Sequence, residues 1–174
     1  DHILEGRKRM TSEATVAFAK DFRNATHFKE FDADLVVIED PVGFIRIVDG
    51  KEEHYLEKQT KERENTGVNE AASWGEGTIG KKKFVGVIFN WEFMVATSSS
   101  VVGEKFVRAM KYAERNHLPV VILYCSGGQR QQEAVPGLRD MDKSVYAIQD
   151  LYKEKVNLPV TSLIIGSTYG GITG

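Results

Sequence analysis

Two glycine pairs, Gly127-Gly128 and Gly170-Gly171, are the residues in this sequence best suited to do chemistry. Each pair follows an apolar run, PVVILYC before the first and PVTSLII before the second. Adjacent glycines let a backbone approach a ligand closely and present its N–H groups to it. Two sets of amide donors in one crevice would suit a reaction in which negative charge develops on an oxygen atom. Taken singly, either pair is better explained as a plain turn, and it is the two pairs together that favour a function.

The two apolar runs, 119–125 and 159–165, have the length and the β-branched content of parallel strands buried on both faces. In open α/β sheets, ligands bind beyond the carboxyl ends of such strands, which is where both glycine pairs fall. The chain continues this pattern in the order strand, strand, helix, strand, helix, strand. That order predicts an α/β fold with right-handed crossovers and a largely parallel sheet.

Periodicity and helix-boundary signals predict the remaining elements. Gly67 is expected to end one helix, and a turn at Gly80-Lys81 is expected to join two strands into a hairpin. The predicted helices span 10–22, 52–65, 102–116 and 130–153, the last interrupted at Val135-Pro136-Gly137, and the predicted strands span 34–38, 70–79, 83–91, 119–125 and 159–165.

The composition limits the class of protein. The 174 residues, 41% of them apolar and 28% charged, suffice for one domain with its own core. A net charge of −2 gives no reason to expect nucleic acid as the main partner. Cys125 is the single cysteine, and the four histidines lack ligand spacing, so we expect no disulfide and no metal site in this sequence. No apolar run approaches the ~18 residues that cross a membrane.

Three motifs carry a resemblance to a known family: SVVGEKFVRAM at 100–110, SGGQRQQEA at 126–134 and YGGITG at 169–174. Together with FKEFDADLVVIEDPVGF and YLEKQTKERENTGVNEAASWGEGTIG, their order resembles the acetyl-CoA carboxylase carboxyltransferase β-subunit family of the crotonase superfamily. The resemblance implies a crotonase-like (ClpP/crotonase) ββα superhelical fold. It also implies an N-terminal helical extension at 1–27 and, at 28–174, the first part of a carboxyltransferase domain that continues beyond residue 174.

The resemblance further implies a reaction. The carboxyl group of carboxybiotin, held on a biotin carboxyl carrier protein, would pass to acetyl-CoA and give malonyl-CoA for fatty-acid synthesis. The partner would be a carboxyltransferase α subunit or an equivalent domain in a hetero-oligomer, in the bacterial cytoplasm or the plastid stroma. Gly127, Gly128, Gly170 and Gly171 would be the oxyanion positions. The zinc ribbon common in bacterial and plastid members would lie upstream of these residues or would not exist.

Three basic residues are candidates for substrate binding. Lys105 and Arg108 fall in the first turns of the helix expected from Val102, where a helix N-terminus favours the phosphates of CoA. An ordinary solvated helix face is the alternative for these two. Arg130 follows the first glycine turn directly, and its place in the motif implies a role at the site or at an interface.

Two segments of the chain differ from the family pattern. Val95 and Ala96 stand where the family's FMGGSMGSVVG has its first glycines, and Gln129 and Gln131 stand in its SGGARMQE. A biotin-independent decarboxylase of malonyl-type acyl-CoA or acyl-carrier substrates is the nearest alternative function. A non-catalytic scaffold subunit is the other.

Three further readings are rejected or left as expectations. Ser126 and Cys125 lack the surroundings of a nucleophile, and GEGTIG at 75–80 matches a dinucleotide motif in the wrong context. Strand 159–165 has nothing after it in this sequence to cover one face, so we expect a helix to follow Gly174.

Overall fold

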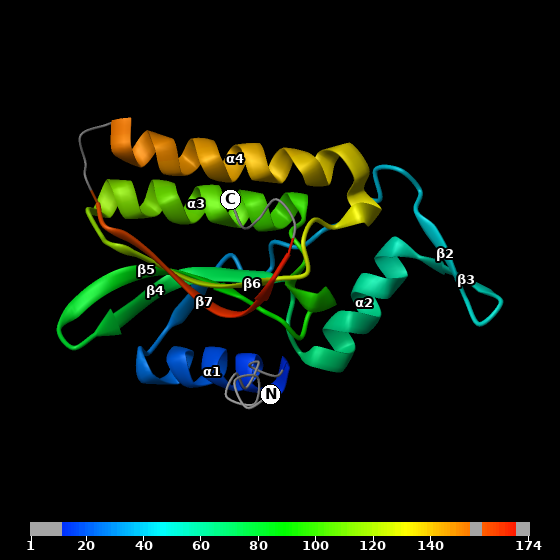
Figure 1. The fold of residues 1–174 in the computed structure, drawn as a ribbon, viewed down its shortest axis with the longest axis horizontal. Helices are drawn as coiled ribbons and strands as arrows, with labels where there is room; N and C mark the ends of the chain where they lie inside the picture. Colours follow the sequence, from blue (N-terminus) through cyan, green and yellow to red (C-terminus); the bar gives the residue numbers. More distant parts are fainter. Residues whose placement is uncertain (1–11, 154–157, 170–174) are drawn as a thin grey trace, which may run out of the picture.

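A five-stranded mixed sheet forms the centre of the computed structural model, which describes residues 12–153 and 158–169 (Figure 1). The strand order is β1-β4-β5-β6-β7. The strands are β1 (Lys29–Phe31), β4 (Ala72–Ile79), β5 (Lys82–Phe89), β6 (Val120–Ser126) and β7 (Val160–Thr168). Strands β5, β6 and β7 run parallel to one another, whereas β1 and β4 pair antiparallel. The predicted α/β class is confirmed, and the parallel part is the half that carries the first glycine pair.

Helices cover both faces of this sheet. Helices α3 (Ser100–Asn116) and α4 (Ala134–Lys153) lie side by side on one face, and α1 (Ser12–Ala25) lies on the other (Figure 1). The apolar face predicted for α3 is buried as expected: Val102, Phe106, Ala109, Met110 and Ala113 all face the core. No helix in the described ranges has the length and apolar content to cross a membrane.

The predicted hairpin and the predicted helix stop are both confirmed. Strands β4 and β5 are joined at Gly80, whose φ is +62°, and helix α2 (Tyr55–Thr66) ends at Gly67 with a φ of +70°. The GEGTIG segment lies within β4. A Cβ on Gly75 would overlap the carbonyl oxygen of Lys29 in the neighbouring strand. Gly75 therefore allows β1 and β4 to pair closely. The segment is part of a strand and is not a dinucleotide-binding loop.

The strand predicted at 34–38 is wrong. Residues 35–40 have no regular structure, although LVVI is rich in strand formers. Side chains hold this segment by its carbonyls instead of a neighbouring strand: Arg63 donates to Val37 O at 3.3 Å, and the Asn69 amide donates to Ala33 O, just before the predicted strand, at 2.9 Å. The strand in this region is β1, which precedes the apolar run and pairs with β4.

A second hairpin was not predicted. Strands β2 (Ile45–Val48) and β3 (Lys51–His54) project from the body beside α2 (Figure 1). Their turn is Asp49-Gly50, with φ values of +52° and +75°, which is the Asp-Gly signal for a two-residue hairpin turn. As a result α2 begins at Tyr55 instead of residue 52.

The interruption predicted in the last helix is also wrong. A 3₁₀ turn (Gln131–Glu133) comes first, and α4 then runs continuously from Ala134. Pro136 falls in the first turn, where a helix does not need its missing N–H. Strand β7 also differs from the expectation of burial on both faces, because 161–164 are exposed, Leu163 by 43% and Ile164 by 72%. In the described residues β7 is an edge strand whose sheet partner is β6.

Candidate active site

The Gly127-Gly128 turn follows β6 directly, at the carboxyl end of the parallel strands. Gly128 has a φ of +104°, a conformation that strains any residue with a side chain. A Cβ on Gly127 would lie 3.1 Å from Val95 O, so the loop packed against the turn leaves no comfortable room for one. Gly128 thus requires glycine for its backbone angles, and Gly127 requires it because the Val95 loop lies so close.

The amide hydrogens of the turn are engaged within the protein. Gly127 N–H donates to Val95 O at 2.8 Å, and Gly128 N–H donates to the Ser126 hydroxyl at 3.1 Å. The acceptor of Gly128 N–H is a side-chain oxygen, which moves if the Ser126 side chain changes rotamer and gives up its bond to Ala96 O, whereas Val95 O belongs to the main chain. Gly128 is therefore the amide that an incoming oxyanion can recruit most readily.

The second predicted pair, Gly170-Gly171, lies outside the described residues. The end of β7 that leads to it reaches the first turn. Thr168 pairs with Ser126, and Tyr169 N–H donates to Ser126 O at 3.0 Å. The described part of the chain therefore brings the end of the second apolar run beside the first glycine turn.

Neither candidate nucleophile is available for attack. The Ser126 hydroxyl is buried and donates to Ala96 O at 2.8 Å. Burial raises the pKa of the Cys125 thiol to about 12, so it stays protonated and unreactive at neutral pH. The structural roles predicted for both residues agree with these contacts.

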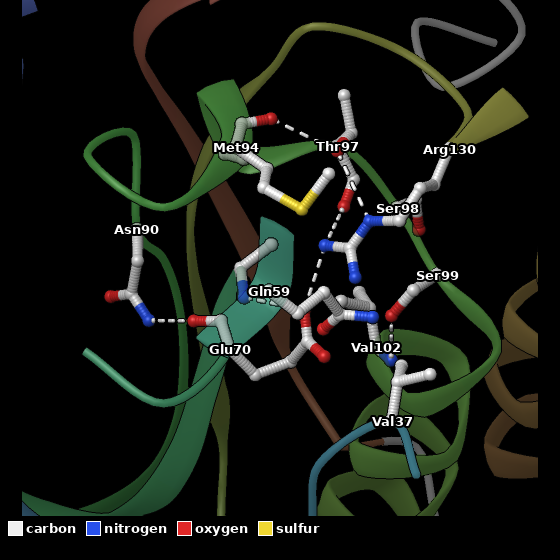
Figure 2. A network of polar contacts seen from close by, with 12 residues as sticks. Val37, Gln59, Glu70, Asn90, Met94, Thr97, Ser98, Ser99, Val102 and Arg130 are labelled. Atoms are coloured by element: carbon white, nitrogen blue, oxygen red, sulfur yellow. Dashed lines mark hydrogen bonds and ion pairs between the residues drawn. The ribbon is translucent and has the colours of Figure 1, made fainter. Parts of the chain in front are cut away.

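Arg130 follows the turn closely in the sequence, and its side chain is buried. Figure 2 shows its guanidinium pointing toward Glu70, with Nη2 at 2.7 Å from Glu70 Oε1 and 2.9 Å from Thr97 O. The group also sits over the Phe93 ring at 5.7 Å. Burial acts to lower the pKa of Arg130, but the charge of Glu70 outweighs it and the pKa is raised. In this arrangement Arg130 positions the loop, and its substrate-binding role stays a prediction.

The N-terminus of α3 is closed by protein groups. Glu133 Oε2 accepts from Ser100 N–H at 2.6 Å, and the Ser99 hydroxyl accepts from Val102 N–H at 3.1 Å. The other oxygen of Glu133 accepts from the Tyr55 hydroxyl at 2.7 Å. Because a carboxylate already occupies this helix end, the argument for a phosphate there loses its physical basis.

Lys105 and Arg108 are likewise paired with carboxylates. The Lys105 side chain is buried, and its Nζ lies 4.0 Å from Glu30 Oε1. Burial lowers the pKa of Lys105, while nearby carboxylates, Glu30 foremost, oppose that effect. Arg108 is half-exposed and contacts Asp32 at 3.0 Å and Glu104 at 2.9 Å. The predicted binding of CoA phosphates by these two residues finds no support in this arrangement.

The comparison with known protein families identifies the family of this chain. The model of the carboxyl transferase domain matches residues 41–173, which is most of the chain. The chain belongs to the carboxyl transferase domain family. The predicted resemblance is therefore confirmed.

Relatives of known name agree with this assignment. The chain is 37% identical over 145 residues to the acetyl-coenzyme A carboxylase carboxyl transferase subunit beta of Brevibacillus brevis, covering 83% of this chain and 43% of that protein. It is 36% identical over 146 residues to the subunit of the same name from Clostridioides difficile, covering 84% of this chain and 48% of that protein. The chain thus spans about half the length of the curated relatives it matches.

Solved structures confirm the crotonase-like fold. A transcarboxylase 12S structure with methylmalonyl-coenzyme A and methylmalonic acid bound superimposes with a TM-score of 0.66 at 21% identity, over 88% of this chain and 26% of that chain. A Pseudomonas malonate decarboxylase hetero-tetramer in complex with malonate gives a TM-score of 0.57 at 21% identity, over 88% of this chain and 52% of that chain. At these identities the likeness concerns the fold.

The loop of this carboxyl transferase domain that supports the glycine turn is strained. Met94, Val95 and Ala96 have φ values of +47°, +56° and +50°, which cost an L-residue about 1–2 kcal/mol each. Val95 and Ala96 stand where the family pattern has glycines, which would adopt these angles without that cost. Their carbonyls hold Gly127 and Ser126, so this loop fixes the glycine turn from below.

Sequence reasoning missed Asp140, a buried acid next to this turn. Asp140 is 2% exposed and accepts a hydrogen bond from the Ser98 hydroxyl, while Ser98 N–H donates to Gly128 O at 2.9 Å. Burial raises the pKa of Asp140 to about 7. The sequence did contain a signal for this burial. Asp140 precedes Ser144 and Ile148 by four and eight residues, so helical spacing puts all three on the face that α4 turns inward.

We expect the free energy of unfolding to depend on pH through the ionisation of Asp140. The folded-state pKa of about 7 exceeds the ordinary value near 3.8, so folding loses stability as the pH rises from about 4 through 7. Asp140→Asn should therefore raise the free energy of unfolding at pH 8 by roughly 2–4 kcal/mol, with little difference at pH 4. Urea unfolding across this range measures it. The exposed Asp142→Asn serves as the control, and an identical pH profile for wild type and Asp140→Asn would contradict the prediction.

Proposed function

We propose that this chain is part of a carboxyltransferase β-type subunit that moves a carboxyl group from carboxybiotin to acetyl-CoA, giving malonyl-CoA for fatty-acid synthesis. The family match over residues 41–173 carries the proposal. The relatives named acetyl-coenzyme A carboxylase carboxyl transferase subunit beta support the choice of substrate.

The described residues fit the demands of this reaction. Carboxybiotin, when bound, supplies the carboxyl group as carbon dioxide and leaves a base for the α-proton of the thioester. The reaction places negative charge on carbonyl oxygens and needs no side-chain nucleophile from this chain. Gly128 N–H is the donor suited to such an oxygen, because its present acceptor is the side-chain oxygen of Ser126 and not a main-chain carbonyl. One donor of this kind contributes about 3 kcal/mol to the transition state.

The other residues near the turn hold it in place. Arg130 ties the Thr97 carbonyl to Glu70, and the carbonyl of Val95 holds Gly127. These contacts fix the position of the turn before any substrate arrives, and a fixed backbone favours an oxyanion site. Gly170-Gly171 remain the proposed second set of donors.

The proposal includes partners and a location. A carboxyltransferase α subunit or an equivalent domain would complete the site, and a biotin carboxyl carrier protein would deliver the carboxyl group. The relatives from Brevibacillus brevis and Clostridioides difficile favour the bacterial cytoplasm over the plastid stroma. Among the described residues no group of His, Cys, Asp and Glu is arranged to hold a metal ion.

Biotin dependence tests the proposal directly. The full subunit, assembled with its partner, is incubated with malonyl-CoA with and without biocytin, a soluble biotin. We expect consumption of malonyl-CoA that depends on biocytin. Equal consumption without biocytin would instead favour the decarboxylase, and binding without any consumption would favour a scaffold subunit.

A further inference from the structure

The β2–β3 hairpin and the segment before it leave apolar side chains uncovered. The two strands form a sheet of their own, apart from the five-stranded sheet, and project beside α2 (Figure 1). A two-stranded hairpin is barely stable in water without further packing. Yet Ile38, Val42, Ile45 and Ile47 are exposed by 77%, 51%, 46% and 64%. Exposed apolar side chains that gather in one segment mark an interaction site.

The two faces of the hairpin differ. Arg46 and Glu53 stand opposite each other on one face with an ion pair of 2.8 Å, and Lys61 of α2 lies 3.8 Å from the same carboxylate. That face therefore turns toward α2. Because side chains alternate along a strand, Ile45 and Ile47 lie on the opposite face, away from the helix. The apolar face is the one that a partner can reach.

The outer edge of β2 is open. In a two-residue hairpin the residues that flank the turn exchange backbone hydrogen bonds, and every second residue after them does the same. The bond of 3.2 Å from Tyr55 N–H to Phe44 O continues this alternation past the end of the strands. Ile45 and Ile47 fall between the bonded positions, so their N–H and C=O groups point away from β3. In the described residues β2 has no second strand partner, and unpaired edge groups are a template for another strand.

Carboxylates lie on both sides of β2 in the chain. Glu39 and Asp40 precede the strand, and Asp49 and Glu52 follow it. Asp49 and Glu52 have no ion-pair partner in the described part of the chain, whereas the Arg46 cation is already paired. A second copy of this hairpin would bring the same carboxylates to the interface, where like charges repel. The surface therefore suits a partner with basic residues at the ends of its strand.

We propose that β2 is a docking edge for a partner protein, which adds an extended strand with apolar side chains at alternate positions and lysine or arginine at its ends. The backbone groups of Ile45 and Ile47 bond to the added strand, and their side chains pack against its apolar side chains. The carboxylates before and after β2 meet its basic ends. This interaction goes beyond the proposed function and does not depend on carboxyl transfer.

A synthetic peptide tests the docking edge. The probe is a fluorescently labelled peptide, Lys-Lys-Val-Thr-Val-Lys-Lys, and its binding to the full subunit is measured by fluorescence anisotropy. The control peptide, Glu-Glu-Val-Thr-Val-Glu-Glu, has the same apolar pattern and the opposite charge. The lysine peptide should bind at least about tenfold more tightly than the control peptide. If the lysine peptide does not bind, or if the two peptides bind equally, the proposal is overturned.

Variants of Ile47 test whether the peptide binds at β2. Ile47→Thr keeps a β-branched residue but loses apolar contact, so it should weaken binding of the lysine peptide roughly fivefold. Ile47→Pro removes the N–H at the open edge and leaves the bonds to β3 in place, so it should weaken binding roughly tenfold. Ile79→Thr is the matched control, because Ile79 is a 56% exposed isoleucine in the five-stranded sheet. Unchanged binding by Ile47→Pro, or equal effects of the two threonine variants, would overturn the docking edge.

Self-association is measured separately, by sedimentation of the full subunit over a range of concentrations. If the subunit self-associates and Ile47→Thr abolishes that association, a second copy occupies the edge and the proposal is overturned. The same association state in wild type and Ile47→Thr supports a different partner protein. Peptide binding is measured without turnover, so a failure of the biocytin assay counts against the proposed function alone.

Discussion

Replacing Gly128 by valine is expected to lower the turnover of carboxyl transfer on the order of 100-fold or more, with little change in acyl-CoA affinity. The φ of +104° at this position is strained for valine, so the backbone must rotate and carry its N–H away from the developing oxyanion. The rest of the CoA molecule is bound elsewhere, which leaves affinity nearly unchanged. Turnover and the Michaelis constant, measured in the biocytin assay, separate the two effects.

Gly80→Val provides the control for this substitution. Gly80 also has a positive φ, +62°, but lies in the β4–β5 turn, away from the glycine turn. It should cost stability without a comparable loss of turnover. Near-normal turnover in Gly128→Val would show that the pair is a plain turn.

Removing Arg130 is expected to have the largest effect on stability. Arg130→Ala leaves Glu70 as a buried charge without its cation, and the loss should be about 3–5 kcal/mol in the free energy of unfolding. Urea unfolding measures it. The double variant Arg130→Met with Glu70→Leu should lose less than the single one, because no unpaired charge remains buried.

Arg108→Ala is the matched control for Arg130. Its ion pairs with Asp32 and Glu104 are solvent-accessible, so the loss should stay below about 1 kcal/mol. If the two alanine variants lost equal stability, the Arg130–Glu70 pair could not be what holds the loop beneath the glycine turn.

The sequence by itself determined the elements whose signals are local. The β4–β5 hairpin, the stop at Gly67 and the buried face of α3 follow from glycine conformation and side-chain period, which need only a few neighbouring residues. The position of Gly127-Gly128 after β6 follows in the same way. The family could also be recognised from the sequence alone, because its motifs are contiguous stretches of residues.

Only the tertiary structure decided which groups those elements bring together. Arg130 and Arg108 carry the same charge and both pair with carboxylates far along the chain, but only the Arg130–Glu70 pair is buried, and this burial makes Arg130 a support for the loop. Asp140 meets Ser98 across 42 residues, and Glu133 closes the start of α3 across 33. The run LVVI has the propensity of a strand but no strand to pair with. In each case the outcome depends on long-range partners and burial, which local residue patterns do not encode.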